Sequence, residues 1–132
     1  MASELRVNTL KDASGNNSVA MSTVTGGVSK SFVNFDMAGT TARESFNLSS
    51  LTDRATGQFT ANLSSAHDSA GYACVGVSNN YAGDSFQGAG SFGLHANHIF
   101  TSTASAYGLS SYSGSAYVDA SHNSTATHGD LA

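Results

Sequence analysis

The chain has no proline and no tryptophan, and it contains a single cysteine, Cys74, among its 132 residues. One cysteine cannot form a disulfide within the chain, so its fold depends on non-covalent packing alone. Proline also protects the edges of β-sheets from pairing with foreign strands. A β-rich chain without proline must protect its edges in another way, and self-association is one.

Charge is scarce and unevenly placed. Charged residues are 11% of the chain, and every Lys and Arg precedes residue 55. The net charge of −4 arises entirely beyond that point, from Asp68, Asp84, Asp119 and Asp130. Nucleic acids and anionic membrane surfaces are bound mainly through Lys and Arg, so we expect neither as a partner. Low charge also leaves little repulsion between copies, which favours a homo-oligomer.

Long hydrophobic runs are missing as well. No stretch approaches the roughly twenty apolar residues that span a bilayer. Glu4, Arg6 and Asn8 interrupt the apolar core that a secretory signal would need. We therefore expect a protein that is synthesised in the cytoplasm and is not inserted into a membrane. Its length suits one domain with a modest core.

The chain does contain many short β-type segments, separated by clusters of Gly, Ser, Asn and Asp. Phe59, Ala61 and Leu63 alternate with polar neighbours, which is typical of a strand with one face on a core. No amphipathic helix competes with this pattern. The sequence predicts an all-β fold, a small antiparallel β-sandwich or barrel. The predicted strands are 5–10, 18–22, 31–35, 45–48, 58–63, 72–78, 90–94, 98–103, 106–109, 116–119 and 125–128.

Residues 1–23 predict a β-hairpin arm that precedes the main domain. Apolar and polar residues alternate on both sides of a break at 12–17. The segment 24–30 has two adjacent glycines and no clear pattern, so we expect a linker there and a β domain over 31–132. An isolated hairpin is marginal in water, so the arm must dock on its own domain, a sister chain or another protein. Its candidate contact residues are Leu5, Val7, Leu10, Val19 and Met21.

Three motifs of the chain occur together in one known family. Residues 3–10 read Ser-Glu-Leu-Arg-Val-Asn-Thr-Leu and lead to a Ser-Gly-Asn turn, 43–50 read Arg-Glu-Ser-Phe-Asn-Leu-Ser-Ser, and 59–63 read Phe-Thr-Ala-Asn-Leu. These segments resemble short bacteriophage virion proteins of the tail-fibre-like type, which carry Ser-Glu-x-x-Val-Asn-x-Leu, Arg-Asp-Ser-Phe-Asn-Val-Ser-Ser and Tyr/Phe-Thr-x-Asn-Phe. The resemblance covers residues 1 to about 79 and the ending 125–130, and it is absent from 80–124.

The resemblance implies a trimeric, β-structured protein of the virion surface with no catalytic residues to carry over. We expect a non-enzymatic component of the short tail-fibre type, anchored by its arm and contributing to host attachment. Two alternatives stay open. A fibre shaft needs a repeat and this chain has none, which favours a capsid decoration (cement) protein that binds the major capsid protein. The third alternative is a small carbohydrate-binding module.

Candidate catalytic and metal-binding groups form no convincing pattern. A histidine repeated on a threefold axis could hold a metal, but exposed or loop histidines are the better interpretation of His67, His95, His98, His122 and His128. The chain lacks a Gly-x-Ser-x-Gly elbow, and most acids stand in predicted turns, where Asp is common for backbone reasons. We assign no catalytic residue, no metal ligand and no cofactor. Cys74 lies in an apolar run and is expected to be buried.

The tyrosines give the remaining binding signal. All five follow residue 71 and are interleaved with Ser, Gly and Asn, a composition typical of recognition loops. We expect Tyr107 and Tyr117 to pack on the core as strand residues. Tyr81 and Tyr112 are the candidate receptor contacts, and a host surface glycan is the partner that such contacts would suit.

Overall fold

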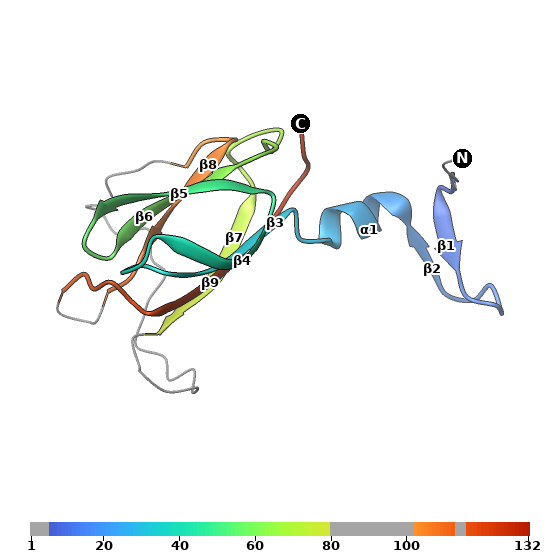
Figure 1. Ribbon diagram of the computed structural model, residues 1–132. Helices are drawn as coiled ribbons and strands as arrows, with labels where there is room; N and C mark the ends of the chain where they lie inside the picture. Colours follow the sequence, from blue (N-terminus) through green and yellow to red (C-terminus); the bar gives the residue numbers. More distant parts are fainter. Residues whose placement is uncertain (1–5, 80–101, 113–115) are drawn as a thin grey trace, which may run out of the picture.

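The computed structural model describes residues 6–79, 102–112 and 116–132, and these form a projecting arm and a β-sandwich (Figure 1). The arm consists of the hairpin β1 (Thr9–Lys11) and β2 (Ser18–Ala20) followed by helix α1 (Met21–Gly27). It leads directly into the first strand of the sandwich, which begins at Ser31. The predicted all-β class is confirmed, with one short helix added.

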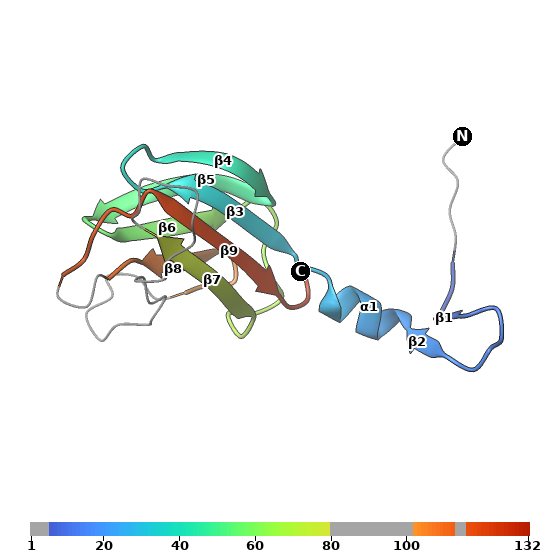
Figure 2. The same cartoon turned by 90° about the horizontal axis from the view of Figure 1, so that it is seen from below.

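Two antiparallel sheets make the sandwich (Figure 2). The four-stranded sheet has the order β4-β3-β9-β7, and its strands are β3 (Ser31–Asp36), β4 (Thr41–Phe46), β7 (Ala73–Asn79) and β9 (His122–His128). The three-stranded sheet has the order β5-β6-β8, and its strands are β5 (Leu48–Ala55), β6 (Gln58–Leu63) and β8 (Ala106–Ser110). Within the described residues the sheets form a sandwich and do not close into a barrel.

The apolar core lies between β3 and the three-stranded sheet. Val33 and Phe35 point inward from β3, because they alternate with the more exposed Phe32 and Asn34. Phe35 meets Phe59 of β6 with ring centroids 5.7 Å apart, in the tilted arrangement that aromatic pairs favour. The other buried members of this cluster are Met37, Ala61, Leu63, Tyr107, Leu109 and Ala120.

The interior is polar beneath β9. Thr127 Oγ1 lies 2.6 Å from Ser31 Oγ and 3.0 Å from Nε2 of the buried His67. Tyr107, a core residue as expected, places its hydroxyl 3.0 Å from Thr125 Oγ1. The hydroxyls of Thr127, Ser31, Tyr107 and Thr125 thus each have a partner, which offsets the cost of removing them from water.

Asn123 continues this polar interior at the start of β9. It is fully buried, and its side-chain nitrogen donates to the carbonyls of Ala120 at 2.7 Å and Phe35 at 3.3 Å. Its side-chain oxygen accepts from Ser78 Oγ at 2.8 Å, an interaction that ties β9 to β7. A core built partly from hydrogen-bonded side chains explains how a chain that is only 39% hydrophobic fills a sandwich.

The chain crosses from one sheet to the other at Asn47, in the left-handed region with φ 56°. Asn tolerates this conformation better than most residues. Its side chain donates to the carbonyls of Lys30 and Ser65, each at 3.0 Å, and accepts from Ser65 N at 2.7 Å. The predicted strand 45–48 is therefore wrong, because this corner divides it into the end of β4 and the start of β5.

Three further expectations differ from the structure. The segment 24–30 is not wholly irregular, because α1 runs to Gly27, and seven residues are too few to display a helical periodicity. The predicted strand 116–119 is reduced to an isolated bridge between Tyr112 and Tyr117. Cys74 is exposed, because among the described strands β7 lies at the edge of its sheet, with β9 as its one neighbour. The predicted strand 90–94 and most of 98–103 lie outside the described residues.

Candidate interaction surfaces

The arm presents an uncovered apolar face. Leu10 and Val19 are paired across the hairpin, so their side chains share one face, and the bond from Met21 N to Asn8 O places Met21 on the same face. Leu10 is exposed, Val19 and Met21 are half-buried, and no residue of α1 is buried. A hairpin in this state has little hydrophobic stabilisation of its own.

The hairpin turn is nevertheless well ordered by Asp12. One carboxylate oxygen accepts from Ser14 Oγ at 2.9 Å and from Asn16 N at 3.1 Å, and the other accepts from Asn17 Nδ2 at 2.7 Å. These bonds, led by the one from Asn17, lower the pKa of Asp12 from its ordinary 3.8. The arm is thus preorganised at its tip and uncovered along its apolar face.

A second apolar surface crosses the outer face of the four-stranded sheet. Strand register aligns Phe46 of β4, Phe32 of β3, Ala126 of β9 and Val75 of β7 in one line, which we call the apolar row. The rings of Phe32 and Phe46 stack with centroids 6.1 Å apart, and Phe46 is 53% exposed. Val77, further along β7, is also exposed. Exposed apolar surface of this kind marks an interaction site.

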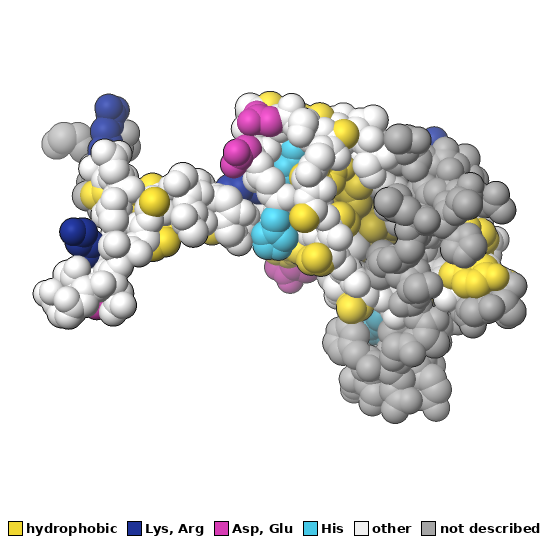
Figure 3. Space-filling view, turned by 180° about the vertical axis from the view of Figure 1, so that it is seen from behind, with side chains coloured by type: hydrophobic (Ala, Val, Ile, Leu, Met, Phe, Trp, Pro, Cys, Tyr) yellow, Lys and Arg dark blue, Asp and Glu magenta, His cyan; other side chains and the backbone are white. Residues whose placement is uncertain are grey.

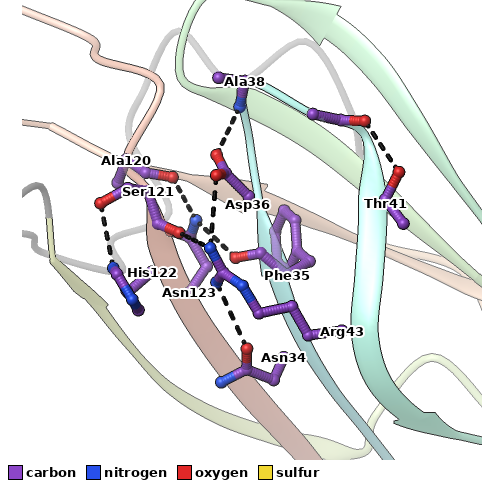
Figure 4. A network of polar contacts seen from close by, with 11 residues as sticks. Asn34, Phe35, Asp36, Ala38, Thr41, Arg43, Ala120, Ser121, His122 and Asn123 are labelled. Atoms are coloured by element: carbon purple, nitrogen blue, oxygen red, sulfur yellow. Dashed lines mark hydrogen bonds and ion pairs between the residues drawn. The ribbon is translucent and has the colours of Figure 1, made fainter. Parts of the chain in front are cut away.

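One side of the apolar row is flanked by a polar network (Figure 4). Arg43 occupies the bulge in the pairing of β3 with β4 and reaches over the outer face of the sheet. Its guanidinium donates to the carbonyl of Ser121 at 2.8 Å and lies 3.3 Å from the Asp36 carboxylate. Because this ion pair is solvent-exposed, its main effect is to hold Arg43 in place. These contacts connect β4 to the residues that directly precede β9.

A shallow hollow of about 270 Å³ lies where the C-terminal residues meet the start of β7. Tyr72 stacks on His67 with ring centroids 4.1 Å apart, and its hydroxyl donates to the carbonyls of Thr103 and Ala106. Desolvation raises the pKa of Tyr72 to about 12, so this phenol stays protonated. The exposed carboxylates of Asp68 and Asp130 also line the hollow.

Metal-binding and nucleophilic side chains are the next features of the described residues. No group of three or more His, Cys, Asp or Glu among them could hold a metal ion. Although Cys74 is solvent-exposed, nearby protein atoms desolvate its thiol and raise its pKa to about 11. The thiol is therefore protonated near neutral pH and a poor nucleophile. His67 lies in the loop between β6 and β7, as expected of a loop histidine, and it is buried because its ring is stacked on Tyr72 and bonded to Thr127.

The residues proposed from sequence lie in different places. Val7 is exposed on the arm with Leu10. Tyr112 is half-buried and meets Tyr117 edge-on, with ring centroids 5.3 Å apart. Leu5 and Tyr81 lie outside the described residues, as do His95 and His98. The apolar row was not predicted from the sequence. One signal for it was present, because Phe32 and Phe35 stand on opposite faces of one predicted strand, which indicates a strand that is apolar on both faces.

No protein-family model matches the chain, and no curated protein or solved structure matches it either. Within the described residues, no helix has the length and apolar character needed to cross a membrane.

Proposed function

We propose that this chain is a non-enzymatic structural protein of a bacteriophage virion, a homotrimeric surface component of the short tail-fibre type. The arm is its anchor on the particle, and the sandwich faces outward. The observation that carries the proposal is the contrast between a sandwich that buries its own core and an arm that leaves Leu10 and Val28 exposed. The resemblance of its motifs to those of tail-fibre-like proteins is the reason for proposing that the chain is part of a virion.

The hairpin suits an anchoring role for a physical reason. Its apolar face of Leu10, Val19 and Met21 gains hydrophobic stabilisation only when another surface covers it, so folding and docking are coupled. Arg6 and Lys11 add positive charge to the arm, and Figure 3 shows Lys and Arg side chains at its far end. Glu4 and Asp12 balance these charges in the sequence, so an apolar and uncharged acceptor surface on another virion protein would fit this arm best.

Deletion of residues 1–20 tests the anchor, because it removes the hairpin and keeps the residues of α1 in the chain. We expect the shortened protein to keep its sandwich and to be lost from virions of the phage that encodes it, as measured by mass spectrometry of purified particles. The matched pair is Leu10→Ser with Val19→Ser against Thr9→Ser with Ala20→Ser, which alters the opposite face of the same hairpin. Only the first pair should lose incorporation. Retention of the deleted protein would refute the anchor.

Capsid decoration is the second candidate, because the described chain is a short arm on a compact sandwich with no shaft element. In that role trimers would bind neighbouring coat subunits and stabilise the shell. Quantitative mass spectrometry of purified virions distinguishes the two locations. A few trimers per particle indicate the tail, whereas scores of copies indicate the shell and contradict the tail-fibre assignment.

Glycan binding is the third candidate, and the hollow beside Tyr72 favours it. Aromatic rings with nearby carboxylates suit the apolar faces and hydroxyl groups of a sugar. A glycan array with the purified protein tests this role, with Asp68→Asn and Asp130→Asn as variants that remove only exposed charge. Binding that these variants abolish would support the hollow as the site. Absence of binding at high protein concentration would remove glycan recognition from the proposal.

A further inference from the structure

Apolar residues run along α1 and continue onto the sheet. Met21 and Val24 lie in α1 and Val28 caps it, at spacings of three and four residues. Residues so spaced fall along one side of a helix, as in the seam of a coiled coil. Four residues further on, Phe32 begins the apolar row as the second residue of β3. Figures 1 and 2 show that α1 passes straight into β3.

Helix α1 cannot be stable without a partner. It has seven residues, no side-chain cap at its N-terminus and no buried residue. Helices shorter than about 12 residues are marginal in water even when their sequences favour helix. Among the described elements, α1 packs appreciably only against β2, and no described strand of the sandwich makes more than a weak contact with it. The described part of this copy therefore does not supply the helix with a partner.

Opposite charges stand on the two sides of the apolar row. Lys30 precedes the buried Ser31 and so falls on the outer face, on the arm side of the row. Glu44 pairs with Asn34 on the opposite side of the row. Within the described part of the chain neither side chain makes an ion pair. A surface with an apolar centre, a cation on one edge and an anion on the other complements a second copy of itself.

We propose that the stripe Met21, Val24 and Val28 and the apolar row of Phe46, Phe32, Ala126 and Val75 together form the interface between copies of this chain. Three α1 helices pack around a threefold axis, and the outer sheet faces pack beside them, with Lys30 of each copy against Glu44 of the next. This contact is heterologous and closes as a ring, as a trimer requires. The three hairpins then project together from one end, free to dock elsewhere.

The mass of the purified full chain in solution, measured by light scattering, tests the interface. We expect three times the chain mass of 13.4 kDa for the native protein. Phe32→Ser combined with Phe46→Ser should give a monomer with an unchanged circular dichroism spectrum, because both side chains are exposed. The control is Leu131→Ser, whose side chain is 40% exposed against 39% for Phe32 but lies off the row. It should stay trimeric. A monomeric or dimeric native protein, or a trimeric double variant, overturns the inference.

A charge exchange tests the pairing between copies. Lys30→Glu and Glu44→Lys should each lower the fraction of trimer, since each places like charges together. The double variant restores opposite charges across the interface and should recover the trimer. Absence of this rescue, with both single variants still folded, contradicts the arrangement around the axis.

The inference deepens the proposed function, because it rests on the trimeric state proposed there. The two can fail separately. A monomeric purified protein would overturn the interface while leaving hairpin-dependent incorporation intact. A stable trimer that still enters virions without its hairpin would refute the anchor and leave the interface standing.

Discussion

The sandwich and the arm are built from similar small polar residues, yet they are stabilised in different ways. In the sandwich, β3 packs its apolar face against the three-stranded sheet, and buried side chains such as Ser31, Thr127 and Asn123 are hydrogen-bonded in the interior. In the arm, the hairpin is closed by local hydrogen bonds around Asp12, and its apolar residues have no cover. The sandwich thus has an apolar core of its own, whereas the described arm has none.

Phe35→Ala should produce the largest effect in this comparison. The change empties the centre of the core and should lower the free energy of unfolding by about 3–5 kcal/mol. Leu10→Ala in the arm should leave that value unchanged within about 0.5 kcal/mol, because its side chain packs against little. Urea unfolding followed by circular dichroism measures both. Similar losses for the two variants would abolish the distinction between the regions.

Two glycines with left-handed backbones sharpen the comparison. Gly57 has φ +65°, and an added Cβ would lie 2.6 Å from Val118 N and 2.7 Å from Ser111 O. Gly57→Ala should therefore cost about 2–4 kcal/mol, from backbone strain and overpacking together.

Gly15, at the tip of the arm, has φ +70° but nothing within 4 Å of an added Cβ. Gly15→Ala introduces backbone strain without crowding, and this strain is confined to the hairpin. The midpoint of thermal unfolding of the sandwich should therefore not change. Equal shifts in midpoint for Gly57→Ala and Gly15→Ala would show that crowding at Gly57 has no consequence.

A pair of Thr→Val substitutions compares hydrogen bonds in the two regions. Thr127→Val keeps the shape of the side chain but removes the hydrogen bonds that Thr127 Oγ1 makes with Ser31 Oγ and His67 Nε2, so we expect a loss of about 1–3 kcal/mol. Thr25→Val in α1 removes exposed bonds to the carbonyls of Met21 and Ser22 and should not affect the sandwich. Urea unfolding measures the free energy of unfolding of both variants. An unchanged value for Thr127→Val would contradict the stabilising role of the polar interior.

The smallest effect concerns the pH dependence of the hairpin turn. The pKa of Asp12 is lower in the folded turn than its ordinary 3.8, so the carboxylate stabilises the turn above that pH. The stabilisation is lost as the pH falls through the lower folded value. NMR titration of the Asn16 amide should report a midpoint below 3.8, and Asp12→Ala should remove the transition. A midpoint at or above 3.8 would contradict the turn geometry.

Much of the sandwich could be predicted because its apolar strands alternate clearly. Phe59, Ala61 and Leu63 predicted β6 with its observed bounds. The sequence pattern located β9 only in part. Its inward-facing residues are Asn123, Thr125 and Thr127, and alternating polar residues do not indicate a buried strand face. The corner at Asn47 was missed for another reason. When the chain passes from one sheet to the other, the alternation of apolar and polar residues does not mark the point of passage.

The candidate surfaces were predictable to different degrees. The apolar residues of the hairpin were visible as alternation near the N-terminus. The apolar row was not, because it is assembled by register from four strands that are distant in the sequence. The hollow likewise joins His67 and Tyr72 to Asp130, and only the folded chain brings them together.

Hydrogen exchange of backbone amides, measured by mass spectrometry on the purified protein and on protein in virions, tests the central contrast most directly. The account predicts that β6 and β9 are protected in both samples, whereas β1 and β2 exchange rapidly in the purified protein and become protected on the particle. Hairpin amides as slow as those of β6 in the purified protein, or unprotected on the particle, would contradict it.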